Sequence, residues 1–128
     1  MKKWIILLLS VMMIAGCGQE KEKDREAVYM NITAQEAKVI MDSQEDYTIL
    51  DVRTQKEYDP GHIPGAILIP DYEIEEKAEQ VLRDKDQLLL VYCRSGRRSK
   101  LAAEALVALG YTNIKEFGGI IDWPYEVE

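Results

Sequence analysis

The sequence predicts an α/β fold in which helices cover both faces of a parallel sheet. Segments with strand patterns alternate along the chain with helical ones, and the inner strands, residues 47–52 (YTILDV) and 87–92 (QLLLVY), are apolar on both faces. Such strands are typical of parallel sheets enclosed by helices. With 128 residues, 47% of them hydrophobic, the chain has room for one domain with its own core. We place that domain at residues 28–128.

Caps, periodicity and turn residues define the individual elements. Thr33 and Glu36 have the spacing of a capping box, so a helix begins after Thr33 and ends near Ser43. Turn residues at 59–61 (DPG) and 64–65 (PG) place the segment between the second and third strands in a loop. The expected strands are 28–32, 47–52, 66–69, 87–92 and 113–117, and the expected helices are 34–43, 71–83 and 99–109. In the last helix the expected core-facing side chains are Leu101, Ala105, Leu106 and Leu109, with Gly110 ending the helix. Gly118–Gly119 follow the last expected strand, and a short turn with Trp123–Pro124 comes after them.

Residues 1–16 are expected to be a signal peptide rather than part of the domain. Two lysines precede a predominantly apolar run of twelve residues (4–15), whereas a membrane-spanning helix needs roughly 20. The run ends in IAGC (14–17), which resembles the lipobox of bacterial lipoproteins and implies cleavage before Cys17 and acylation of its sulfur. An uncleaved anchor and an ordinary signal peptide are the alternatives. The lipoprotein interpretation predicts an extracytoplasmic protein that is lipid-anchored to the bacterial cell membrane, with 17–27 as a charged tether.

The charge distribution favours a small anionic ligand. The formal net charge is −7, which argues against nucleic acid as a partner because phosphate binding needs a basic face. Arg94, Arg97 and Arg98 therefore form a local positive cluster on an acidic protein. We expect no cofactor and a monomeric protein.

Cys93 is the residue for which the sequence offers the most chemistry. It could be a buried structural residue, half of a disulfide, a metal ligand or a nucleophile. If Cys17 is acylated, Cys93 has no disulfide partner in the chain, which contains two cysteines. A metal site is disfavoured as well, since His62 is the one histidine and no second thiol is available.

The segment from Cys93 to Arg98 connects a strand to the following helix. A helix N-terminus presents unpaired N–H groups and the positive end of the helix dipole. Gly96 lets the backbone curl so that successive N–H groups face inward, and a thiol in such a loop ionises more readily. Arg94, Ser95 and Arg97 complete the expected anion-binding loop. These arguments favour a nucleophile over a buried structural cysteine, and both interpretations remain open at this point.

Four further residues are expected to support the site. Asp51 lies at the end of a strand that is expected to be the neighbour of the Cys93 strand, and Arg53 and Glu57 follow Asp51 in the sequence. An ion pair or loop cap is the favoured role for Asp51, with an active-site acid as the alternative. His62 lies in a turn rich in glycine and proline, where a hydrogen-bonded loop residue is favoured over a general base.

Three segments together resemble the rhodanese family of sulfurtransferases. They are ILDVRTQKEYDPGHIPGAILIP (49–70), LLVYCRSGRRSKLAAEALVALGY (89–111) and IKEFGGIIDWP (114–124). Their order and spacing are those of a single rhodanese domain. The resemblance implies a three-layer α/β/α fold with a five-stranded parallel sheet in the order 3-2-4-5-1.

The resemblance also implies a reaction. The Cys93 thiolate would take the outer sulfur of an anionic donor such as thiosulfate and pass it, as a persulfide, to a thiophilic acceptor. By position, the active-site loop is Cys93 to Arg98, with Arg94 and Arg98 contacting the anion and Arg97 pointing outward.

Two other functions are compared with this one. Rhodanese-like phosphatases and arsenate reductases place an arginine six positions after the cysteine, whereas here that position is Ser99 and the arginine comes one earlier. The loop length therefore argues against a phosphatase. A non-catalytic binding or regulatory module, or a carrier that hands persulfide sulfur to a protein partner, remains the alternative.

Overall fold

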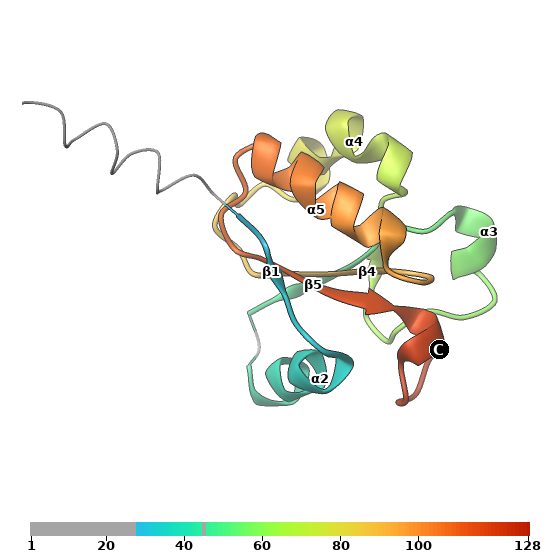
Figure 1. Cartoon of the computed structure of the whole chain (residues 1–128). Helices are drawn as coiled ribbons and strands as arrows, with labels where there is room; N and C mark the ends of the chain where they lie inside the picture. Colours follow the sequence, from blue (N-terminus) through green and yellow to red (C-terminus); the bar gives the residue numbers. More distant parts are fainter. Residues whose placement is uncertain (1–27, 45) are drawn as a thin grey trace, which may run out of the picture.

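The fold is a five-stranded parallel sheet with helices on both sides (Figure 1). The computed structural model describes residues 28–44 and 46–128, so the predicted signal peptide, Cys17 and tether lie outside the described residues. The strands are β1 (Met30–Asn31), β2 (Thr48–Asp51), β3 (Ile67–Leu68), β4 (Leu89–Cys93) and β5 (Ile114–Gly119). Their order, β1-β5-β4-β2-β3, with every pair parallel, confirms the predicted 3-2-4-5-1 arrangement.

Helices form the two outer layers. They are α2 (Ala34–Ser43), α3 (Gln55–Tyr58), α4 (Ile74–Val81) and α5 (Arg97–Ala108), with short 3₁₀ turns η1 (Asp71–Glu73) and η2 (Ile120–Asp122). Helices α4 and α5 cover one face of the sheet, and α2 covers the other (Figure 1). Among these helices, none combines the length and the apolar character that a membrane span requires.

The pleat of the strands sorts side chains into two apolar cores. In β4, Leu89, Val91 and Cys93 face α4 and α5, whereas Leu90 and Tyr92 face the α2 side. All five β4 residues are buried. This alternation follows from the two-residue period of a strand, and it decides which polar groups can reach Cys93.

The segment between the second and third strands differs from the prediction. It was expected to be loop, but it contains the one-turn helix α3, which starts with a capping box between Thr54 and Glu57. This box has the same T-x-x-E spacing that predicts α2 from Thr33 and Glu36. No apolar periodicity accompanies the box at Thr54, so the prediction of a loop rested on the turn residues that follow it.

Helix α5 and strand β5 also depart from expectation. Helix α5 begins at Arg97, two residues earlier than predicted. Leu101 is 50% exposed, so the prediction that it faces the core is wrong. Ala102, Ala103 and Leu106 occupy the face of α5 that meets the sheet. Strand β5 continues through Gly118–Gly119, although the strand was expected to end at Phe117. The predicted helix at 71–83 is divided into η1 and α4.

Candidate functional site

The candidate site lies at the carboxyl end of β4, where Cys93 is the last residue of the strand. Ligands of parallel α/β sheets bind at this edge. The Cys93 thiol is free of disulfides and fully buried, on the face of the sheet that α5 covers. Its neighbours therefore come from α5 and from the end of β5.

The loop after Cys93 curls as the sequence predicts. Gly96 has φ of +106°, a left-handed conformation that favours glycine, and it is the residue before α5. The Gly96 N–H donates to Cys93 Sγ at 3.0 Å. The sulfur is thus placed at the positive end of α5, where negative charge is favourable. Arg94, Ser95 and Arg97 are exposed around it.

Strand β5 fixes the outer side of this loop through Gly119. A Cβ atom added to Gly119 would lie 2.0 Å from the carbonyl oxygen of Arg94 and 2.5 Å from the Cα of Ser95. The Ile121 N–H donates to that Arg94 oxygen at 3.2 Å. Close approach of two backbones therefore requires glycine at 119, a role that was not predicted from the sequence.

Arg98 is held by Glu57 from α3. Its two terminal nitrogens donate to the two carboxylate oxygens at 2.7 and 2.9 Å, a bidentate ion pair. Hydrogen bonding by Arg98, aided by the bonds from Thr54, lowers the pKa of Glu57 to about 2 although burial opposes the shift. The same ion pair raises the pKa of Arg98, and the nearby Cys93 adds to this rise. The structure thus brings together Glu57, a predicted supporting residue, and Arg98, a predicted loop residue 41 positions away.

Asp51 and Arg53 lie on the opposite face of the sheet from Cys93. Asp51 is fully buried and pairs with Arg53 at 2.7 Å, and it accepts the Tyr92 hydroxyl at 2.5 Å. Burial, followed by the bond to Asp51, raises the pKa of Tyr92. Arg53 also donates to the carbonyl of Gly61 at 2.8 Å. This ion pair anchors the segment after β2, the role that the sequence favours for Asp51.

His62 is engaged in structural contacts. Its ring stacks on Tyr58 with centroids 3.8 Å apart and planes 2° from parallel. Nδ1 lies 3.1 Å from the Tyr58 carbonyl oxygen, and Nε2 lies 3.5 Å from a carboxylate oxygen of Glu128. The structure therefore places His62 in the loop packing that the sequence favours for it.

Two polar residues beside Cys93 were not predicted as site residues. Ser99, in the first turn of α5, has its hydroxyl oxygen 3.4 Å from Cys93 Sγ. Glu116, in β5, has a carboxylate oxygen 2.5 Å from that hydroxyl, and both residues are fully buried. Glu116 stands two residues after Ile114 and so shares the inward face of its strand, which is the signal that could have identified the second of them.

Comparisons with known proteins agree with this geometry. The sequence model of the rhodanese-like domain matches residues 33–124. A putative sulfur carrier protein, YrkF of Bacillus subtilis, is 35% identical over 112 residues, which are 87% of this chain and 60% of the relative. The thiosulfate sulfurtransferase PspE of Escherichia coli is 40% identical over 73 residues, 57% of this chain and 70% of that protein. The chain thus spans about three fifths of the length of YrkF.

A solved structure gives the same result for the fold. A rhodanese with anions from E. coli superposes with a TM-score of 0.60 at 35% identity, over 64% of this chain and 96% of that one. The residues matched by the family model, 33–124, include Cys93 and the loop that follows it. The names of the relatives associate such domains with sulfur transfer in general. The chain therefore belongs to the family of rhodanese-like domains.

Proposed function

We propose that this protein is a sulfurtransferase in which Cys93 carries the sulfur. The observation that carries the proposal is the bond from the Gly96 N–H to Cys93 Sγ at 3.0 Å, at the start of α5. A thiolate is the reactive form of cysteine, and backbone N–H groups at a helix N-terminus stabilise its charge. The names of the relatives PspE and YrkF support sulfur as the transferred group.

The proposed reaction has two displacement steps. The Cys93 thiolate attacks the outer sulfur of a donor such as thiosulfate, the sulfur–sulfur bond of the donor breaks, and sulfite leaves with the bonding electron pair. A thiophilic acceptor then attacks the outer sulfur of the persulfide and regenerates the thiolate. In each step negative charge moves between sulfur atoms next to the loop, so its preorganised N–H groups stabilise the transition states.

The arginines have separate proposed roles in binding the donor. Arg94 is exposed on the loop, where its guanidinium can turn toward an anion. Arg98 is oriented by its bidentate bond to Glu57 and presents its positive charge beside Cys93. Arg97 is exposed in the first turn of α5, in accord with an outward position.

Mass measurement of the intact protein tests the proposal. We would treat the full-length chain carrying Cys17→Ala, in detergent, with thiosulfate, since Cys93 is then its one cysteine. We expect the mass of one added sulfur, its loss on addition of cyanide, and no adduct in the further variant Cys93→Ser. A correctly folded protein that gains no cyanide-labile sulfur would exclude the sulfurtransferase function and leave a binding module.

Transfer to a protein partner is a second candidate, which the relation to a putative sulfur carrier favours. The two functions differ in the second step. A free enzyme discharges its persulfide to cyanide over many turnovers, whereas a carrier takes up sulfur but turns over slowly with small acceptors. Steady-state thiocyanate production, compared with the single-turnover adduct, distinguishes them.

We further propose that the protein is lipid-anchored outside the cytoplasm through Cys17. The proposal rests on the IAGC sequence at 14–17 and the preceding short apolar run. In bacteria grown with a labelled fatty acid, the wild-type protein should carry label and sediment with membranes. Cys17→Ala should lose both properties, and an unchanged distribution would exclude the anchor.

A further inference from the structure

Glu116 is a buried carboxylate on the Cys93 side of the sheet. It is fully buried in β5, and its oxygens accept from Asn31 Nδ2 at 2.6 Å, from the Ser99 hydroxyl at 2.5 Å and from the Gly118 N–H at 2.9 Å. Within residues 28–44 and 46–128, no salt bridge involves it. Three donors thus compensate its burial.

The Ser99 hydroxyl has one proton and several acceptors around it. Besides Glu116, the carbonyl oxygens of Gly96 and Gly118 lie 3.0 and 3.4 Å from its oxygen. The charged and nearest acceptor is the carboxylate of Glu116, so the proton is directed there. Ser99 consequently presents a lone pair to Cys93 Sγ, and the geometry at 3.4 Å suits donation from the thiol S–H to the Ser99 oxygen.

We propose that Glu116 is a positioning residue that, by orienting Ser99, holds Cys93 as the protonated thiol in the resting protein. A thiolate at the same position would face the lone pair of Ser99 and, behind it, a negative carboxylate. The proposal rests on the proposed function in treating Cys93 as the reactive group. It adds a restraint on that group, which lowers the fraction of thiolate in the resting protein.

Other charged groups act on the same site. Arg98 and the N-terminus of α5 favour the thiolate, with Glu57 and Asp71 facing Arg98. Near Glu116 lie Asn31 of β1 and Tyr29, which precedes that strand, and the exposed Glu104 of α5 faces Tyr29. Glu116 and Ser99 therefore oppose a cationic environment, and the balance between the two sets the pH at which Cys93 ionises.

Absorbance of the thiolate near 240 nm tests this inference without any sulfur donor. The full-length Cys17→Ala protein would be titrated with pH, with its Cys93→Ser variant as the baseline for tyrosine absorbance. We expect Glu116→Gln, a variant of nearly the same shape, to lower the midpoint of thiolate formation by about one pH unit. At a pH below both midpoints that shift corresponds to roughly tenfold more thiolate.

Further variants separate the route through Ser99 from a simple charge effect. Ser99→Ala should also lower the midpoint, and Glu116→Gln should cause a smaller shift in the Ser99→Ala background than alone, because coupled residues are not additive. Ser99→Thr keeps the hydroxyl and should resemble the parent, as should Glu104→Gln, which removes a nearby exposed charge.

Several outcomes would overturn the inference. An unchanged or raised midpoint in Glu116→Gln excludes the proposed effect of Glu116 on Cys93. Equal shifts of the midpoint in the parent and in the Ser99→Ala background exclude the route through Ser99. If Glu116→Gln does not fold, Ser99→Ala decides by itself, since the proposal requires its midpoint to fall. Failure of sulfur uptake from thiosulfate would count against the proposed function and leave these titrations unaffected.

Discussion

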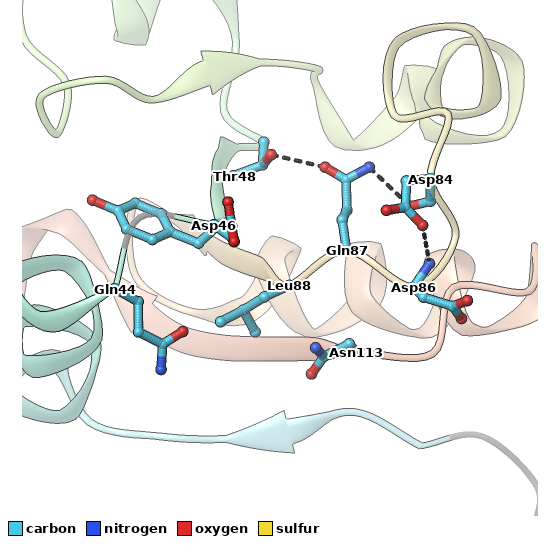
Figure 2. A pocket seen from close by; sticks show the side chains of 9 residues that line it. Gln44, Asp46, Thr48, Asp84, Asp86, Gln87, Leu88 and Asn113 are labelled. Carbon is cyan, nitrogen blue, oxygen red and sulfur yellow. Dashed lines mark hydrogen bonds between the residues drawn. The ribbon is translucent and has the colours of Figure 1, made fainter.

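The two edges of the sheet use their polar groups in different ways. At the carboxyl edge, the loop after β4 directs an N–H group and the start of α5 at one sulfur atom. At the amino edge there is a hollow of about 570 Å³ (Figure 2). It is lined by Gln44, Asp46, Tyr47, Thr48, Asp84, Asp86, Gln87, Leu88 and Asn113, and none of these belongs to the Cys93 loop.

The polar groups of the amino edge largely bind one another. Figure 2 shows Thr48 donating to Gln87, Gln87 donating to the carbonyl of Asp84, and the Asp86 N–H donating to the carboxylate of Asp84, at 2.8, 2.8 and 2.9 Å. Parallel strands direct helix N-termini to the opposite edge, where unpaired N–H groups are available. The size of a hollow is therefore a poor guide to the reactive end of this molecule.

The largest effect is expected for Gly119→Ala at the carboxyl edge. The new methyl group would overlap the Arg94 carbonyl, so either β5 or the active-site loop must move. We expect a loss of about 3 kcal/mol in the free energy of unfolding, together with loss of sulfur uptake. Urea unfolding and intact mass measure both effects. Gly61→Ala is the matched control, because its Cβ would meet Val127 at an ordinary 3.8 Å. Similar behaviour of the two variants would contradict the proposed backbone contact.

A smaller loss is expected for Tyr92→Phe, on the far face of the same edge. The Tyr92 hydroxyl bonds Asp51 and accepts the Ile63 N–H at 3.0 Å, so its removal leaves two buried groups short of a partner. We expect a loss of about 2 kcal/mol. Tyr111→Phe, which removes one buried bond to the Leu82 carbonyl, should cost about 1 kcal/mol. Thermal unfolding measures the loss of stability in both variants. Equal losses would mean that the hydrogen bonds around Asp51 add no stability beyond that of one buried hydrogen bond.

The ion pair between Glu57 and Arg98 predicts an acid-dependent loss of stability. Because the folded-state pKa of Glu57 is lowered to about 2 from 4.5, its contribution is fully present above about pH 4.5 and is lost as the pH falls toward 2. The pair is partly exposed, so we expect about 1 kcal/mol. The difference in unfolding free energy between the parent and Glu57→Gln should shrink over that range.

Glu36→Gln is the matched control for this pH dependence. Glu36 caps α2 through the Thr33 N–H as Glu57 caps α3, but it forms no salt bridge in the described part of the chain. If its pH dependence equalled that of Glu57→Gln, the effect would belong to the cap and not to Arg98.

The smallest effect is expected at the amino edge. Gln87→Ala removes the bonds to Thr48 and Asp84 at a solvent-facing site. We expect a change of less than about 0.5 kcal/mol in stability and no change in sulfur uptake by Cys93. A marked loss of sulfur uptake would show that the two edges are coupled, which would undermine the distinction drawn between them.

Local signals predict an element well where they agree with each other. At α2 the capping box of Thr33 and Glu36 precedes apolar residues with helical spacing, and the predicted helix is confirmed. At α3 the same box precedes turn residues, and the helix was missed. The difference is physical, since α3 buries none of its residues, and Glu57, which caps it, is also held by Arg98 of α5.

The sequence by itself determined the parallel sheet, its strand order through the family resemblance, and the position of Cys93 in a curled loop before a helix. Those features depend on apolar patterning, on glycine at a left-handed position and on residue spacing within one short segment. Only the tertiary structure decided which side chains meet Cys93. Asp51 is one strand away but faces the other side of the sheet, whereas Glu116 reaches Cys93 through Ser99. The pleat and the register of β4 on β5 set these directions, and both depend on contacts between residues far apart in the chain.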